Sequence, residues 1–184
     1  MRLKEKYQKE IVPQLKEKFS YSNVSLVPKL QKVVINIGFG KIAKEKEKIA
    51  AIEQILIKIS GQKPIMTKAK KSISAFKVRE GMVIGAVATL RGERMYDFVD
   101  KLVNIAFPRV RDFRGISDKG VDRSGNMPVG FKDYSCFPEL SAADLDNIHG
   151  LEVCLNTNAK NREEGLALFR SEERRVGKEC RSRW

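Results

Sequence analysis

The sequence predicts an α+β fold in which helices cover one face of a mostly antiparallel sheet. Several segments alternate apolar residues with small or polar ones, as half-buried strands do. The helical segments between them are apolar on one side only, so each must pack against something. With 184 residues, 42% of them hydrophobic, the chain is long enough to bury one core. We therefore expect a single domain over residues 1–169.

The strands and helices follow from the spacing of apolar residues. Alternation predicts strands over residues 31–40, 63–70, 84–91 and 151–157, whereas 109–136 is expected to be irregular. Helical spacing predicts helices over residues 2–19, 49–59 and 95–106 and a last helix from Asn161. Pro13 should kink the first helix or break it early, while Gly61 and Pro108 should end the next two. Asn161 and Glu164 match the capping-box pattern at the start of the last helix.

Charge indicates a polyanionic partner. The formal net charge is +13, and residues 63–94 hold eight Lys or Arg against two Glu. Such an excess favours nucleic acid or an anionic membrane surface. No apolar run approaches the length of a membrane span, and the N-terminus has no signal-peptide core, so we expect no membrane partner. The sequence therefore indicates an RNA-binding protein.

Two features are candidates for the RNA contact. The open sheet face is expected to carry small and hydrogen-bonding residues, namely Asn36, Gly38, Gly85, Thr89, Arg91 and Asn156. A Ser-rich loop between the second and third strands is flanked by basic residues, namely Lys68, Lys70, Lys71, Lys77 and Arg79. Phe76 is the only aromatic residue in that loop, and it either stacks on a base or anchors the loop.

Other functional classes find little support. Gly38, Gly40 and Ala43 match a dinucleotide-binding pattern, but the charged helix that follows and the missing acidic residue argue against it. His149 is the only histidine, and its place beside a turn does not indicate catalysis. The three cysteines, Cys136, Cys154 and Cys180, lack metal-site spacing. We expect no enzyme activity, no metal and no cofactor.

The last fifteen residues, 170–184, differ from the rest. They have no apolar period and hold the only Trp. This stretch resembles a translated sequencing adapter, and a native basic tail is the alternative. We expect a disordered, non-native tail and exclude it from the fold.

The segments GQKPIMTKAKKSISAFKVREG, ATLRGERMYDFVDKL and FPRVRDFRGIS resemble the bacterial type of the large-subunit ribosomal protein five family, the 5S rRNA-binding ribosomal proteins. The likeness covers residues 3–169, and the family's usual ending is absent after Phe169. The resemblance implies an α+β fold and a location in the cytoplasm, on the ribosome. It implies a structural component of the large subunit that helps to anchor 5S rRNA in the central protuberance.

The resemblance also implies roles for particular residues. It assigns 5S rRNA contacts to Asn36, Gln62 and Thr89, and the neighbouring Lys63, Lys68, Lys70 and Arg91 complete the expected rRNA-binding set. It implies that the basic loop approaches P-site tRNA, with Lys71, Ser72, Ser74, Phe76, Lys77 and Arg79 as the contact residues. Further implied partners are 23S rRNA, other 5S-binding large-subunit proteins and a small-subunit head protein.

Two other functions stay open at this point. A general RNA chaperone or regulatory RNA-binding module would use the same surface. An RNA-modifying or nucleotide-dependent enzyme would need a catalytic constellation that the sequence does not show.

Overall fold

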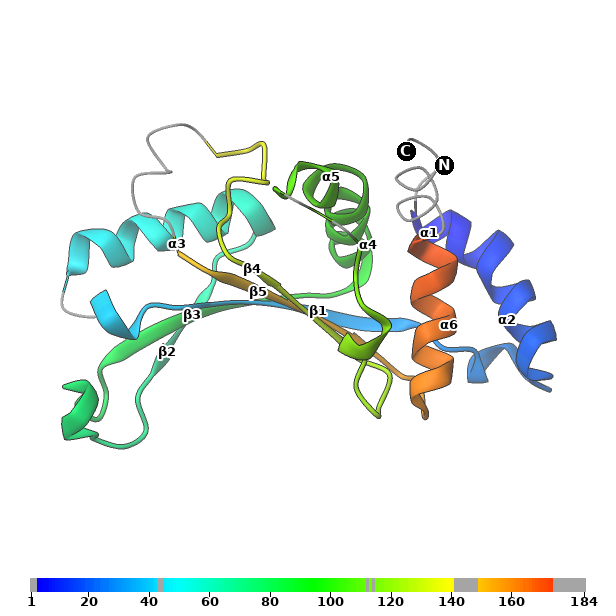
Figure 1. The fold of residues 1–184 in the computed structure, drawn as a ribbon, viewed down its shortest axis with the longest axis horizontal. Coiled ribbons are helices and arrows are strands. Elements are labelled where there is room, and N and C mark those ends of the chain that lie inside the picture. The colour runs from blue at the N-terminus through cyan, green and yellow to red at the C-terminus, as the bar shows by residue number, and fades with distance from the viewer. Residues whose placement is uncertain (1–2, 43–44, 112, 114, 141–148, 174–184) are drawn as a thin grey trace. The chain divides into compact units, whose positions relative to one another are not determined.

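The computed structural model describes residues 3–42, 45–111, 113, 115–140 and 149–173, which form two compact units (Figure 1). The first unit takes its described residues from 1–33, 90–129 and 154–184, and the second takes them from 34–89 and 130–153. Ala43, Cys180 and residues 174–184 of the expected tail lie outside the described residues.

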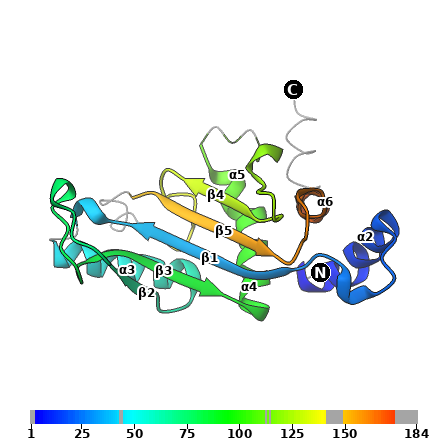
Figure 2. The ribbon, with the colours of Figure 1, turned by 90° about the horizontal axis from the view of Figure 1, so that it is seen from below.

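The strands form one antiparallel sheet, which confirms the α+β prediction. They are β1 (Leu30–Gly38), β2 (Ile65–Lys68), β3 (Val83–Leu90), β4 (Met127–Phe131) and β5 (Leu151–Thr157). Their order across the sheet is β2-β3-β1-β5-β4, and Figure 2 shows neighbouring arrows running in opposite directions. The sheet therefore has β2 and β4 at its two edges.

The strand β4 corrects the prediction that residues 109–136 are irregular. Its sequence, MPVGF, contains Pro128 and Gly130, and both residue types are rare inside strands. Proline cannot donate a backbone hydrogen bond to a neighbouring strand, which confines it to edges, and β4 is an edge strand. These two residues weaken the strand pattern in the sequence, and β4 was therefore not predicted.

In the second unit, α3 (Lys46–Ser60) packs its apolar side on one face of the strands (Figures 1 and 2). Its side chains Ile52, Ile55, Leu56 and Ile59 are buried, as the helical spacing predicted. Gly61 ends the helix in the left-handed region at φ 66°, and its N–H donates to the Ile57 carbonyl at 2.8 Å. The predicted C-terminal stop is confirmed.

The first unit contains the other helices. They are α1 (Leu3–Lys6), α2 (Val12–Phe19), α4 (Gly92–Lys101), α5 (Phe107–Arg109) and α6 (Arg162–Glu173). Buried residues of the N-terminal helical segment and α6 share one apolar cluster, which consists of Tyr7, Ile11, Leu15, Val27, Ala167 and Leu168. The predicted helices are therefore present, with differences at two prolines.

Each of these two prolines follows a π-helical turn. One π turn (Tyr7–Ile11) precedes Pro13, and the other (Leu102–Ala106) precedes Pro108. A proline ring clashes with the carbonyl four residues earlier and supplies no N–H, so the wider turn relieves both conflicts. The first helix consequently continues to Phe19 instead of breaking at Pro13, and the other ends at Arg109, one residue beyond Pro108.

The start of α6 differs slightly from a capping box. The Glu164 carboxylate accepts from the backbone N–H of Lys160 at 2.9 Å, one residue before the expected donor, Asn161. Burial, together with the same carboxylate, raises the pKa of Tyr21. The helix continues through Arg170, which pairs with Asp118, and ends at Glu173.

A tight turn fastens α6 in the first unit. The Asp122 carboxylate accepts from the backbone N–H of Asn126 at 2.7 Å and from its side-chain amide at 3.0 Å. Thr157 at the end of β5 donates its hydroxyl to the Gly125 carbonyl at 2.9 Å. A Cβ built on Gly165 of α6 would lie 2.5 Å from the Gly125 Cα. Two backbones therefore meet at a distance that only glycine permits.

This contact predicts the effect of Gly165→Ala. Alanine favours a helix over glycine by about 1 kcal/mol, but overpacking against backbone costs about 1–3 kcal/mol. We expect a net loss in the free energy of unfolding, measured by urea denaturation. The control is Gly120→Ala, because nothing lies within 4 Å of a Cβ there. An unchanged or higher stability of Gly165→Ala would contradict the close contact.

Asp122 predicts a pH dependence of stability. Burial opposes its ionisation, but hydrogen bonds from Asn126 and Ser124 prevail and lower the pKa of the carboxyl. A carboxyl whose folded pKa is lowered stabilises the fold above its unfolded pKa, and this contribution is lost as pH falls through the folded pKa. The stability difference between the native chain and Asp122→Asn should therefore shrink between roughly pH 5 and pH 2. Denaturant unfolding across this range measures it, and a stability difference that stays constant with pH would contradict the role of these hydrogen bonds.

Candidate nucleic-acid interface

The sheet face opposite α3 in the second unit is open, and it carries two of the expected contact residues. On β1, Ile35 and Ile37 are buried, whereas Asn36 between them is half-buried. On β3, Ala88 is buried and the adjacent Thr89 is half-buried. Because side chains alternate between the faces of a strand, Asn36 and Thr89 both lie on the open face.

Gln62 joins this pair through a hydrogen bond. Its side-chain amide Nε2 donates to the backbone carbonyl of Thr89 at 3.3 Å. Its backbone N–H donates to the Ser60 hydroxyl at 3.2 Å, and that hydroxyl donates to the Leu56 carbonyl at 2.6 Å. The C-terminal turn of α3 thereby fixes Gln62 beside Thr89, with uncharged groups available for hydrogen bonding.

The open face also contains residues that the sequence analysis missed. Ile65 pairs with Val87 across β2 and β3, and its side chain is 75% exposed. Thr67 pairs with Gly85, where an added Cβ would lie 2.7 Å from the Thr67 hydroxyl and 3.1 Å from the Ile37 carbonyl. The face is thus flat and partly apolar instead of uniformly polar. The alternation of side chains within the segment IMTK could have placed Ile65 and Thr67 on this face.

The loop between β2 and β3 carries the charge. Its basic side chains are exposed, and in the described ranges none of them forms an ion pair; they are Lys68, Lys70, Lys71, Lys77 and Arg79. Lys63 differs, because its ammonium lies 4.0 Å from the Glu53 carboxylate. Cations without an internal carboxylate partner are free to neutralise phosphates.

The loop is an ordered hairpin. Ala69 donates its N–H to the Met82 carbonyl at 2.8 Å, and Ile73 and Val78 exchange backbone hydrogen bonds at 2.9 and 3.2 Å. The Ser72 hydroxyl accepts from the Glu80 N–H at 2.9 Å. These bonds hold the charged side chains on a defined backbone.

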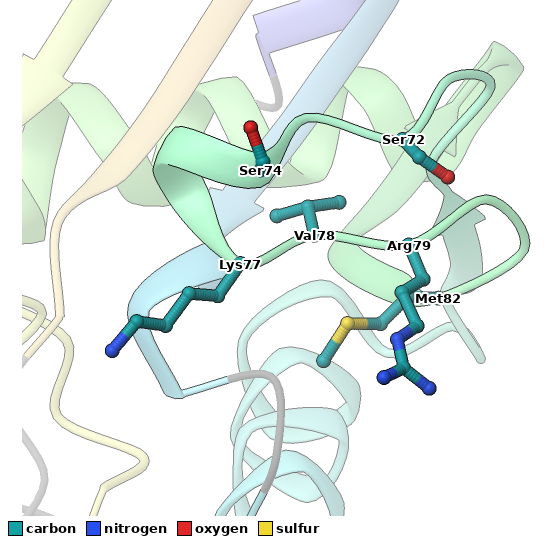
Figure 3. A pocket seen from close by; sticks show the side chains of 6 residues that line it. All are labelled: Ser72, Ser74, Lys77, Val78, Arg79 and Met82. Atoms are coloured by element: carbon teal, nitrogen blue, oxygen red, sulfur yellow. The ribbon is translucent and has the colours of Figure 1, made fainter.

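The hairpin borders an open pocket with a volume of about 850 Å³ (Figure 3). Its lining residues are Ser72, Ser74, Lys77, Val78, Arg79 and Met82. In Figure 3 the charged ends of Lys77 and Arg79 extend away from the loop backbone. A hollow with two cations at its rim suits a phosphate-bearing chain.

The structure divides the expected site residues between the two units. Asn36, Gln62 and Thr89 belong to the second unit, together with the hairpin. Arg91 belongs to the first unit, where it is exposed and occupies the N-cap position of α4.

The remaining reactive groups in the described part of the chain show no catalytic arrangement. Among the described residues no three His, Cys, Asp or Glu side chains gather to hold a metal. Burial, together with the charge of Lys48, lowers the pKa of His149, so the imidazole is neutral at pH 7. Cys136 is buried. In the described ranges, no helix has both the length and the hydropathy to cross a membrane.

An ordered basic hairpin beside a sheet face of hydrogen-bonding groups is the arrangement expected of an RNA-binding protein, and sequence comparison gives the family. The family described as ribosomal protein L5 matches residues 23–79, and the model of that family's C-terminus matches residues 83–176. The chain belongs to the ribosomal protein L5 family.

Individual relatives agree with this assignment, and each is named large ribosomal subunit protein uL5. The protein of Desulforamulus reducens is 52% identical over 169 residues, covering 92% of this chain and 93% of its own length. That of Brevibacillus brevis is 53% identical, covering 91% and 93%. That of Clostridium acetobutylicum is 52% identical, covering 92% and 94%.

Membership of this family confirms several expectations. The chain is a ribosomal structural protein of the large subunit and not an enzyme, and its place is on the ribosome. The expected resemblance is likewise confirmed over most of the chain. Which residues meet which RNA is a separate question.

The loop cations predict a change in the salt dependence of RNA binding. Replacing Lys70, Lys71, Lys77 and Arg79 with Gln should reduce the slope of log K against log salt by roughly 3, since each phosphate contact contributes about 0.7–0.9. Titration of a structured RNA at several salt concentrations measures the slope. Lys48→Gln is the control, because Lys48 pairs with Glu45 at 2.7 Å and should leave the slope unchanged. An equal slope for both variants would exclude the loop from the RNA contact.

Proposed function

We propose that this chain binds 5S rRNA through the open sheet face of its second unit and helps to anchor that RNA in the central protuberance of the large subunit. The observation that carries the proposal is the hydrogen bond from Gln62 to Thr89, beside Asn36 on the same face. These groups are uncharged and held by secondary structure, so they can select a particular RNA shape where mobile lysines cannot.

The basic hairpin has a different role in this proposal. It contacts P-site tRNA through Lys71, Ser72, Ser74, Phe76, Lys77 and Arg79, which are all exposed. The hairpin projects beyond the short strand β2 and is stiffened by its own hydrogen bonds, which suits a reach toward a second RNA. The exposed cations nearer the sheet, Lys63, Lys68 and Lys70, add attraction to rRNA.

Further partners follow from a place in the large subunit. The first unit offers exposed arginines at 91, 94, 109 and 111 for 23S rRNA. Neighbouring 5S-binding proteins and a small-subunit head protein complete the proposed partners. The name of the relatives, large ribosomal subunit protein, supports a place in this assembly.

The division of labour predicts how 5S rRNA binding responds to substitutions. Asn36→Ala and Thr89→Ala should each weaken binding by roughly 1–3 kcal/mol, because each would leave a polar group of the RNA unpaired in the proposed interface. A double Lys77→Gln, Arg79→Gln variant should bind 5S rRNA almost normally, while large subunits that contain it hold P-site tRNA less tightly. Titration of labelled 5S rRNA at fixed salt measures the first effect, with an unrelated structured RNA as the specificity control.

Two outcomes would sink this proposal. One is a loss of 5S rRNA binding only in the hairpin variant, with the sheet-face variants unchanged. The other is equal affinity of the native chain for 5S rRNA and the unrelated RNA, which would indicate a general RNA-binding protein.

A further inference from the structure

Phe76 is the exception among the phenylalanines of this chain. All nine lie in the described residues, and only Phe76 is exposed, at 75% of its surface. A buried phenylalanine gains roughly 1.5–3 kcal/mol over an exposed one, so a ring that anchored the loop would be covered. Phe76 therefore does not anchor the hairpin, and its ring is available to a partner.

The backbone presents this ring in a fixed position. Phe76 ends a short 3-10 turn (Ser74–Phe76), and Lys77 follows in the left-handed region at φ 55°. Lys77 closes the turn by donating its N–H to the Ser74 carbonyl at 3.0 Å. Left-handed backbone costs a lysine about 1–2 kcal/mol, so the surrounding hairpin bonds must impose it.

The neighbouring side chains indicate the chemistry of the partner. Lys77 and Arg79 lie on the segment that follows the 3-10 turn. Neither side chain pairs with a carboxylate in the described part of the chain. A flat, exposed ring beside two free cations matches a nucleobase whose adjoining phosphates need neutralising. A protein partner would have to be strongly acidic to neutralise the two cations of the same loop.

We infer that Phe76 is a stacking platform for one exposed nucleobase face of a folded RNA, and that Lys77 is the positioning residue that sets its angle. The inference deepens the proposed tRNA contact and rests on it. It adds a mode of recognition, because stacking on a base depends on the flat ring and is insensitive to salt, whereas phosphate contact depends on charge alone.

The first test compares side chains of different shape at position 76 in large subunits assembled with the full chain. Phe76→Leu should speed the dissociation of deacylated tRNA from the P site by about fivefold or more, and Phe76→Trp should stay within about twofold of the native rate. Ile73→Ala, which trims another exposed apolar side chain (47%) of the same hairpin, is the control and should have little effect. Equal rates for Phe76→Leu and the native chain would overturn the stacking inference.

The second test isolates the left-handed turn. Lys77→Asn and Lys77→Val remove the same charge, but Asn tolerates the left-handed region and the β-branched Val does not. The dissociation of tRNA should therefore be faster from large subunits that contain Lys77→Val than from those that contain Lys77→Asn. Identical rates would show that Lys77 contributes charge only.

The third test reads the ring directly in the isolated full chain. Phe76→Trp in a Trp184→Phe background holds a single tryptophan, because Trp184 is the only tryptophan in the sequence. Added tRNA should quench its fluorescence by stacking, with the quenching retained when salt is raised at saturating RNA. A blue shift with ribosomal proteins and no quenching with tRNA would assign the ring to a protein interface and refute the inference.

Failure of this inference and failure of the proposed function give different results. If Lys77→Gln with Arg79→Gln leaves the tRNA dissociation rate unchanged, the hairpin does not contact tRNA and the proposed function fails. If that double variant accelerates dissociation and Phe76→Leu does not, only the stacking role fails.

Discussion

Burial of one face of β1 and β3 beneath α3 is the constraint on which the second unit depends. Ile35, Ile37 and Ala88 must leave water together with the apolar side of α3, and the strict alternation of a strand then places Asn36 and Thr89 on the other face. A register shift of one residue would exchange the two sets. The same hydrophobic burial that stabilises the fold thus determines which groups face a ligand.

In the proposed function, the attraction to RNA and the fit to a particular RNA come from different groups. Attraction comes from hairpin lysines and Arg79, which are long, exposed and without carboxylate partners in the described ranges. Fit comes from groups with little freedom, such as the Gln62 amide held on the Thr89 carbonyl. Charge alone draws any polyanion at low salt, whereas fixed hydrogen-bonding groups discriminate between RNA shapes.

Much of this could be predicted from the sequence, and each exception has a local cause. Period-two and period-3.6 apolar spacing located β1, β3, β5 and α3, because both faces of those elements have clear chemistry. The strand β4 was missed because Pro128 and Gly130 suppress the pattern, and only the pairing with β5 at a sheet edge makes MPVGF a strand. The helix does not break at Pro13, because a π turn accommodates the proline, and spacing alone does not reveal such a turn. The left-handed Lys77 was equally invisible, since lysine carries no preference for that region.

In the proposed function, the open face of the second unit, and not its helical face, meets 5S rRNA. Photocrosslinking from single positions tests it most directly. A diazirine side chain at Ile65 lies exposed on the open face, and one at Gln54 lies exposed on α3, so neither substitution disturbs the core. The account predicts efficient crosslinks to 5S rRNA from position 65 and none from position 54. Crosslinks from position 54 with none from position 65 would contradict it.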